Sequence, residues 1–192
     1  MSTQQGKNST SFLSWMVQFL NLLKIYLDGD KMEKTNLYKS VVDDSIFYEF
    51  KEQRGITLFN HSANSNYIED FISVAYVLCP NIIEVNGYVF IADFFDARGD
   101  KATDKLLKLE VQFNSDKKKI EQWVNSWSFG DFFLGKDCES MDNEKILKQF
   151  GDILVYNWTR RAKELFPNRN IVVEYGEGLM GELGLSIMLY EQ

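Results

Sequence analysis

The sequence predicts an α+β fold, in which a small and mostly antiparallel sheet packs with about five or six helices. Asn86-Gly87 lies between two apolar runs and indicates a β-hairpin over residues 82–92, because this dipeptide readily adopts the positive φ angles of a type I′ turn. Two more β-type runs, at 170–176 and 184–190, lie near the end of the sequence. Regular alternation of strands and helices is missing, which disfavours a doubly wound parallel sheet.

Three elements are expected before the hairpin. Apolar residues at helical spacing favour a helix over residues 36–50, and residues 56–60 form a short β-type run. A second helix is expected to follow Asn66, which resembles a capping box when it is paired with Glu69. Pro80 ends this helix, because proline lacks a backbone N–H and its ring clashes with the preceding turn.

An acidic loop and three helices are expected between the hairpin and the last two strands. The loop covers residues 93–104, and residues 102–113 favour a helix that overlaps its end. A further helix begins after Ser115. The longest apolar stripe at helical spacing predicts a helix over residues 142–166.

Length and composition indicate one domain preceded by an apolar extension. The sequence has 192 residues and 45% of them are hydrophobic, which is enough for a sizeable core. We assign residues 32–192 to a single α+β domain and residues 1–31 to a helical extension, with the alternative that Met32 is the natural start. Within the extension, residues 11–27 have the spacing of an amphipathic helix and offer a surface for homo-oligomer formation. An integral membrane span is not expected, because it needs roughly 20 consecutive apolar residues, and polar residues interrupt this stretch.

The formal net charge of −7 and the pI of about 4.8 restrict the class of partner. Nucleic-acid affinity depends largely on lysine and arginine neutralising phosphates, so no nucleic-acid partner is expected. The longest basic run, residues 117–119, is the solvated first turn of a predicted helix. A more basic protein is the expected partner, because complementary potentials accelerate encounter.

The cysteines and the histidine do not indicate a disulfide framework or a metal centre. Cys79 and Cys138 are far apart in the sequence, and we expect a reducing, cytoplasmic location. His61 is the single histidine, whereas a zinc site usually needs clustered Cys and His ligands. A nucleophilic serine or cysteine would also need His61 as its base, and the G-x-S-x-G motif does not occur. We therefore assign no metal, no cofactor and no catalytic residue.

The glycine-rich stretch at 176–181 matches the G-x-G-x-x-G pattern of dinucleotide-binding folds. That pattern binds a pyrophosphate only when a helix follows it, whereas residues 185–190 have the composition of a strand. Glu177 and Glu182 would also repel phosphate. The stretch is therefore interpreted as a connection between two antiparallel strands.

Acidic residues of the predicted loop are the first candidates for binding. Asp93, Asp96 and Asp100 offer carboxylate oxygens, and they could line a pocket for a small molecule. Together with Asp104 they could also offer oxygens to Mg²⁺ or Ca²⁺, but their spacing does not match an EF-hand, so a solvated acidic loop is favoured over a cation site.

Aromatic residues between positions 123 and 133 are the second group of candidates. Trp123 and Trp127 follow helical spacing and are expected in the core. Phe132 and Phe133 lie in a glycine-flanked turn, where a core role explains them less well. These two phenylalanines are therefore candidates for an interface patch.

Three stretches of the sequence resemble a family of bacterial proteins that has no established activity. They are residues 77–90, which run from a helix through proline into the hairpin, residues 124–133 and residues 158–173. The resemblance spans residues 65–175 and depends on residues that specify a fold. It implies that these segments form a structural scaffold, and it assigns no catalytic residue.

Two functional hypotheses follow from these observations. The first is a non-enzymatic, acidic cytoplasmic binding protein, of the immunity or inhibitor type, that holds a more basic protein. The alternative is an enzyme or small-molecule sensor with a carboxylate-lined pocket.

Overall fold

The computed structural model describes residues 16–20, 36–96, 99–136 and 138–192. The chain divides into two compact units, Met1–Tyr38 and Lys39–Gln192. In the first unit residues 16–20 are helical, and the rest of the predicted helix over 11–27 lies outside the described residues. No helix in the described parts of the chain is both long enough and apolar enough to cross a membrane.

The second unit contains helices on both sides of short antiparallel strands. In chain order its elements are η2 (Asp44–Glu49), α2 (Leu58–Ser65), α3 (Ile68–Leu78), β1 (Ile82–Val85), β2 (Tyr88–Ile91), α4 (Ala92–Phe95), α5 (Asp100–Gln112), α6 (Lys117–Val124), β3 (Trp127–Ser128), η3 (Gly130–Phe133), η4 (Glu139–Asp142), α7 (Glu144–Leu165), β4 (Ile171–Glu177), η5 (Leu179–Gly181) and β5 (Leu185–Glu191).

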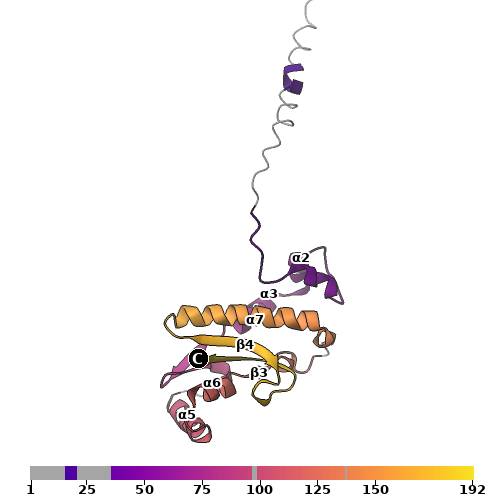
Figure 1. Cartoon of the computed structure of the whole chain (residues 1–192). Helices are drawn as coiled ribbons and strands as arrows, with labels where there is room; N and C mark the ends of the chain where they lie inside the picture. The colour runs from indigo at the N-terminus through magenta and orange to yellow at the C-terminus, as the bar shows by residue number, and fades with distance from the viewer. Residues whose placement is uncertain (1–15, 21–35, 97–98, 137) are drawn as a thin grey trace, which may run out of the picture. The chain divides into compact units, whose positions relative to one another are not determined.

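These elements form an α+β fold, which confirms the predicted fold class. The strands of the hairpin and the last strands belong to two sheets, of order β1-β2 and β3-β5-β4, and all pairs are antiparallel. Figure 1 shows α7 along one side of the three-stranded sheet, with α5 and α6 on the other side. The glycine-rich stretch joins β4 to β5, as the sequence predicted.

The hairpin has the predicted two-residue turn. Asn86 and Gly87 have φ angles of 50° and 84°, and both positive values suit a type I′ turn. Val85 therefore faces Tyr88 across the turn. Glycine is needed at position 87 because other residues adopt such a φ angle at a steric cost.

Strand β2 is buried on both faces and separates two hydrophobic clusters. Tyr88 and Phe90 belong to one cluster, with Leu106 and Ile120. The other face of the strand contributes Val89 and Ile91 to the second cluster, together with residues of α7 and of the three-stranded sheet, namely Leu154, Trp158, Val173, Ile187 and Leu189. Successive strand residues point to opposite faces, so this one strand supplies both cores.

Residues 56–60 do not form the predicted β-type run. The hydroxyl of Thr57 accepts a hydrogen bond from the Asn60 N–H at 3.1 Å and caps helix α2, which begins at Leu58. An N-cap interaction therefore outweighs the β propensity of this short run. The predicted helix over 36–50 is also reduced, to the 3-10 turn η2 after Asp43.

Helix α3 confirms the second predicted helix, with a start one residue later. The Tyr67 N–H donates a hydrogen bond to the Asp70 carboxylate at 2.8 Å, so the cap is at Tyr67 rather than at Asn66. The helix ends at Leu78, two residues before Pro80.

The acidic loop predicted over residues 93–104 is shorter than expected. Residues Ala92–Phe95 form the turn α4, which ends at Asp96 in a left-handed conformation with φ 42°. Helix α5 then begins at Asp100 and confirms the predicted helix over 102–113. Helix α7 likewise confirms the long helix predicted over 142–166.

The placement of Trp123 corrects the predicted core, whereas Trp127 packs against the second hydrophobic cluster. Helix α6 is capped by Asp116 rather than Ser115 and ends at Val124, so Trp127 lies in strand β3 instead of on the helix. Trp123 is on α6, but 47% of it is exposed, and it contacts Phe113. The apolar spacing therefore continues beyond the last residue of the helix.

Candidate functional site

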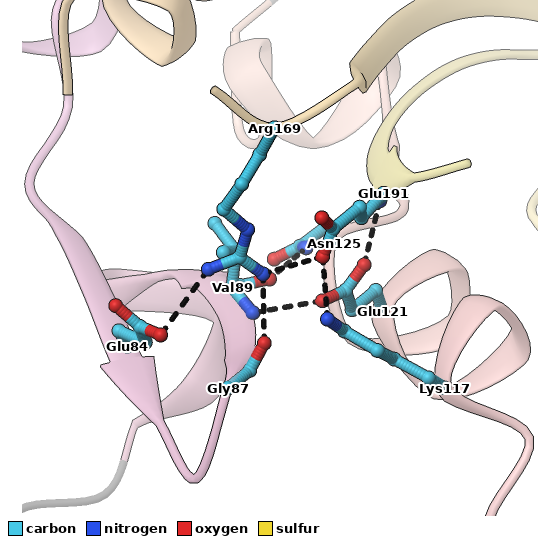
Figure 2. A network of polar contacts seen from close by, with 8 residues as sticks. All are labelled: Glu84, Gly87, Val89, Lys117, Glu121, Asn125, Arg169 and Glu191. Atoms are coloured by element: carbon cyan, nitrogen blue, oxygen red, sulfur yellow. Dashed lines mark hydrogen bonds and ion pairs between the residues drawn. The ribbon is translucent and has the colours of Figure 1, made fainter. Parts of the chain in front are cut away.

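Two buried polar side chains, one on α6 and one at its C-cap, lie between the sheets (Figure 2). The Glu121 carboxylate accepts hydrogen bonds from the backbone N–H groups of Val89, at 2.9 Å, and Glu191, at 2.6 Å. Val89 is in β2 and Glu191 is in β5. One carboxylate therefore connects the two sheets.

Asn125 makes a second connection of the same kind. Its side-chain oxygen accepts from the Ile91 N–H at 2.8 Å, and its amide nitrogen donates to the carbonyls of Val89 and Leu189 at 2.9 and 3.0 Å. The side chains of Glu121 and Asn125 thus occupy the place where a backbone ladder between β2 and β5 would otherwise run. This explains why the hairpin forms a separate sheet.

An ionic cluster surrounds this connection. The Arg169 guanidinium donates to Glu84 at 3.2 Å, to the Gly87 carbonyl at 2.7 Å and to the Glu191 carboxylate at 2.6 Å. Lys117 also pairs with Glu191. These contacts tie the hairpin turn to the last strand.

Two of the carboxyl groups in the network have pKa values shifted in opposite directions. The hydrogen bond from Arg169 lowers the pKa of Glu191 to about 2, with Lys117 contributing further. Burial raises the pKa of Glu121, although its two backbone hydrogen bonds offset part of that effect. Both Glu121 oxygens already accept backbone hydrogen bonds, and neither carboxyl group lines the pockets described below. We therefore interpret this network as structural.

A pocket of about 300 Å³ lies at the end of α3. Its lining is mostly aromatic or apolar and includes two aspartates: Tyr76, Val77, Pro80, Ile91, Asp93, Phe94, Trp127, Asp131, Phe132 and Trp158. The lining residues come from α3, β2, α4, β3, η3 and α7. Because six elements converge there, the pocket is a product of the tertiary fold. We refer to it below as the aromatic pocket.

The rings of the aromatic pocket are held in fixed orientations. Phe94 stacks on Trp127 with centroids 4.5 Å apart and planes within 7°, and it meets Trp158 edge to face at 6.2 Å. The indole N–H of Trp158 donates to the Val77 carbonyl at 2.9 Å. Phe132 packs edge to face on Phe150 at 5.5 Å. Such contacts preorganise an aromatic wall before any ligand arrives.

The two carboxylates of the aromatic pocket differ in their surroundings. Asp93 accepts a hydrogen bond from the Tyr76 hydroxyl at 2.7 Å, and that hydroxyl accepts one from the Asn81 side chain at 3.2 Å. Asp131 is exposed, and within the described residues its carboxylate has no hydrogen-bond or ion-pair partner. The aromatic pocket therefore combines negative charge with aromatic surface, which is the combination that attracts organic cations.

The residues singled out in the sequence are only partly brought together. Asp93 and Phe132 both line the aromatic pocket. Asp96 is exposed at the end of α4 and does not line it, and Asp100 is the first residue of α5. Phe133 contacts Phe150 at 5.4 Å without lining the aromatic pocket.

Several residues of the aromatic pocket were not candidates from the sequence. Asp131 lies next to Phe132 in the glycine-flanked turn, so the same turn signal covers it. Trp158 follows the apolar stripe of α7 and resembles an ordinary core residue. Tyr76 has no sequence signal, because its role depends on the hairpin returning toward α3.

His61 is used in local packing. Its ring lies 5.7 Å from that of Phe47 and 5.2 Å from that of Phe50, and its Nδ1 accepts a hydrogen bond from the Arg54 backbone at 3.1 Å. That nitrogen is therefore engaged by a backbone N–H and not by a carboxylate. In the described parts of the chain, no three Cys, His, Asp or Glu side chains are grouped as metal ligands would be.

A wider hollow of about 740 Å³ lies beside α2. Most of its lining is apolar, with Asp44 as the charged member and serines at its edge: Ser40, Val42, Asp44, Phe50, Leu58, Phe59, Ser62, Ala63 and Phe71. It lacks the converging polar groups that orient a bound molecule, so the aromatic pocket is the better candidate.

Comparison of the chain with protein-family models, with curated proteins and with solved structures finds no match. Function must therefore be argued from the geometry of the aromatic pocket.

Proposed function

We propose that this protein is a non-enzymatic, acidic binding protein of the cytoplasm, of the immunity or inhibitor type, that holds a more basic protein. The observation that carries the proposal is the aromatic pocket, in which Asp93 and Asp131 stand beside Phe94, Trp127 and Phe132. A cationic side chain is attracted both by the carboxylates and by the faces of the rings.

The charge of the whole chain supports the same class of partner. A net charge of −7 speeds the approach of a positively charged surface, and the aromatic pocket then provides a place for a specific anchor. Aromatic residues in preformed pockets are frequent hot spots of protein interfaces.

The proposal is tested by affinity capture from the native host at low salt, with the full chain and two matched variants. Asp131→Asn removes one of the two carboxylates of the aromatic pocket, whereas Asp104→Asn makes the same change on α5, outside its lining. We expect the full chain and Asp104→Asn to retain a basic protein. Asp131→Asn should bind the same protein about tenfold more weakly. If no basic protein is retained at low salt, or if both variants retain it equally, the proposal is wrong.

The second candidate function is an enzyme or sensor that takes a small cationic molecule. The volume of about 300 Å³ favours it, because that is the lower end of the usual range for small-molecule sites. A thermal-shift screen with small organic amines and guanidines distinguishes the two. Saturable stabilisation of the full chain, with no basic protein captured, supports the sensor.

The expected homo-oligomer through residues 11–27 is a separate proposal. It is tested by size-exclusion chromatography with light scattering on the full chain and on a chain without residues 1–31. An oligomer that becomes a monomer after the truncation supports it, and a monomer in both cases contradicts it.

A further inference from the structure

We propose that the group entering the aromatic pocket is the guanidinium of an arginine on the partner. We further propose that apolar residues next to this arginine in the partner pack against helix α3. The inference rests on the proposed function and specifies which chemical group of the basic partner is recognised.

The aromatic walls favour a planar cation. A guanidinium is planar and weakly hydrated, so it stacks on aromatic faces, whereas an ammonium is a compact and strongly hydrated charge. Trp127 and Phe94 stack on each other, so a cation would lie against the ring surface that this stack leaves open, beside Phe132 and Trp158 of the lining. This surface therefore favours a guanidinium, which can stack, over the compact charge of an ammonium.

The carboxylates favour a cation with several donors. Asp93 is oriented by the Tyr76 hydroxyl, which fixes an acceptor at the edge of the aromatic pocket. Asp131 adds a second acceptor that has no partner in the described part of the chain. A guanidinium carries five N–H donors in a rigid fork, so one group can serve two carboxylates that approach from different elements.

An exposed apolar row on α3 leads to the aromatic pocket. Ile68, Ile72 and Tyr76 are spaced four residues apart, which places them on one face of the helix. Their exposed fractions are 76%, 65% and 43%, and Tyr76 also lines the aromatic pocket. Isoleucines this exposed, in line with a preformed pocket, are typical of a binding surface.

This row identifies the source of the arginine. Free arginine would fill the aromatic pocket and leave Ile68 and Ile72 uncovered, whereas a protein segment covers both regions. Four helical residues span about 6 Å, so apolar side chains within a few residues of the arginine reach the row. The occupant is therefore a segment of a basic protein in which an arginine is flanked by apolar residues.

The first test measures three small probes by the tryptophan fluorescence of the full chain, because Trp127 and Trp158 line the aromatic pocket. The probes are the N-acetyl amides of arginine, lysine and citrulline. We expect arginine to bind about tenfold more tightly than lysine, and the neutral citrulline not to bind. Asp131→Asn should weaken arginine binding about tenfold, and Asp104→Asn should leave it unchanged.

The second test concerns the apolar row. A peptide with one arginine and two leucines three and four positions away should bind about tenfold more tightly than the arginine amide. Ile72→Ser should abolish that gain without changing the binding of the arginine amide. The control is Val111→Ser, an exposed apolar residue on α5, which should change neither affinity.

The outcomes separate this inference from the proposed function. Equal affinity for arginine and lysine, or stronger binding of lysine, overturns the guanidinium assignment and leaves the acidic binding protein standing. If the peptide binds no more tightly than the arginine amide, or if Ile72→Ser does not change its affinity, the role assigned to the apolar row is wrong. Absence of saturable binding by every cation, in a chain whose circular dichroism shows it folded, overturns both this inference and the pocket-based function.

Discussion

Glu121 and Asn125 show how two residues decide the architecture of the sheets. Both are fully buried, Glu121 on α6 and Asn125 at its C-cap, and together they bind backbone groups of β2 and β5. Polar groups in such positions are stabilising only when all their partners are present, because a buried group without a hydrogen bond loses its solvation without compensation.

Replacing Asn125 by alanine should destabilise the fold strongly. The Ile91 N–H and the carbonyls of Val89 and Leu189 would lose their buried partner, and we expect a loss of about 3 kcal/mol in the free energy of unfolding. Urea denaturation measures the change. Asn64→Ala is the control, since its amide bonds a carbonyl on an exposed helix, and it should cost less than about 1 kcal/mol.

The lowered pKa of Glu191 predicts that the free energy of unfolding falls in acid. Its pKa in the folded chain is about 2, below the ordinary value of 4.5, so its contribution is fully present above about pH 5 and is lost as the pH falls through 2. The shift corresponds to at most about 3 kcal/mol. The raised pKa of Glu121 acts in the opposite sense, because protonation of that carboxyl favours the folded state.

Urea midpoints between pH 2 and pH 6 test this dependence in the full chain and in Glu191→Gln. The variant should be less stable near pH 6, and its deficit should shrink as the pH falls. A deficit that is constant over the whole range would show that the ionised Glu191 does not contribute as described.

Helix α7 and strand β4 approach each other closely where Gly151 faces the ring of Tyr175. A Cβ added at Gly151 would lie 2.7 to 2.9 Å from three ring atoms of Tyr175, whose hydroxyl bonds Asp152 at 3.1 Å. Glycine is unfavourable in a helix interior, so its presence here reflects the close approach of the ring.

Gly151→Ala should therefore destabilise the chain despite its higher helix propensity. We expect a net loss of about 1 kcal/mol, because overpacking costs more than the helix gains. In a Tyr175→Ala background the ring is absent, and the same substitution should instead stabilise by about 1 kcal/mol. Chemical denaturation of the four chains gives the coupling, and a substitution with the same effect in both backgrounds would contradict the contact.

Element boundaries depended on caps more than on periodicity. The Asn86-Gly87 turn, Pro80 and the long stripe of α7 predicted a hairpin, a helix end and a helix that the structure contains. The Thr57 cap and the early end of α6 were not predicted, because an N-cap and a helix end each depend on one local interaction that an apolar pattern does not report.

At the scale of the whole molecule, β2 makes the two hydrophobic clusters of the second unit one cooperative system. Its alternate residues enter different clusters, so disruption of one cluster displaces a strand that the other needs. Unfolding of the two clusters should therefore occur in a single transition.

Leu106 and Leu107 on α5 provide a matched test. Leu106 is 1% exposed and belongs to one cluster, whereas Leu107 is 53% exposed. Leu106→Ala should cost about 3 kcal/mol, and Leu107→Ala less than about 0.5 kcal/mol. In Leu106→Ala the transitions followed by tryptophan fluorescence and by far-ultraviolet circular dichroism should still coincide. Separate midpoints would show that the clusters unfold independently.

Local propensity, apolar spacing and composition were enough to predict the α+β class, the hairpin, the long helix and the acidic charge. The sequence also indicated Asp93 and Phe132, which carried local signals of charge and of an aromatic turn. The tertiary structure alone decided that these two residues share a pocket with Trp127, Trp158 and Tyr76. Residues so far apart in the sequence meet only through long-range packing, which no local pattern encodes.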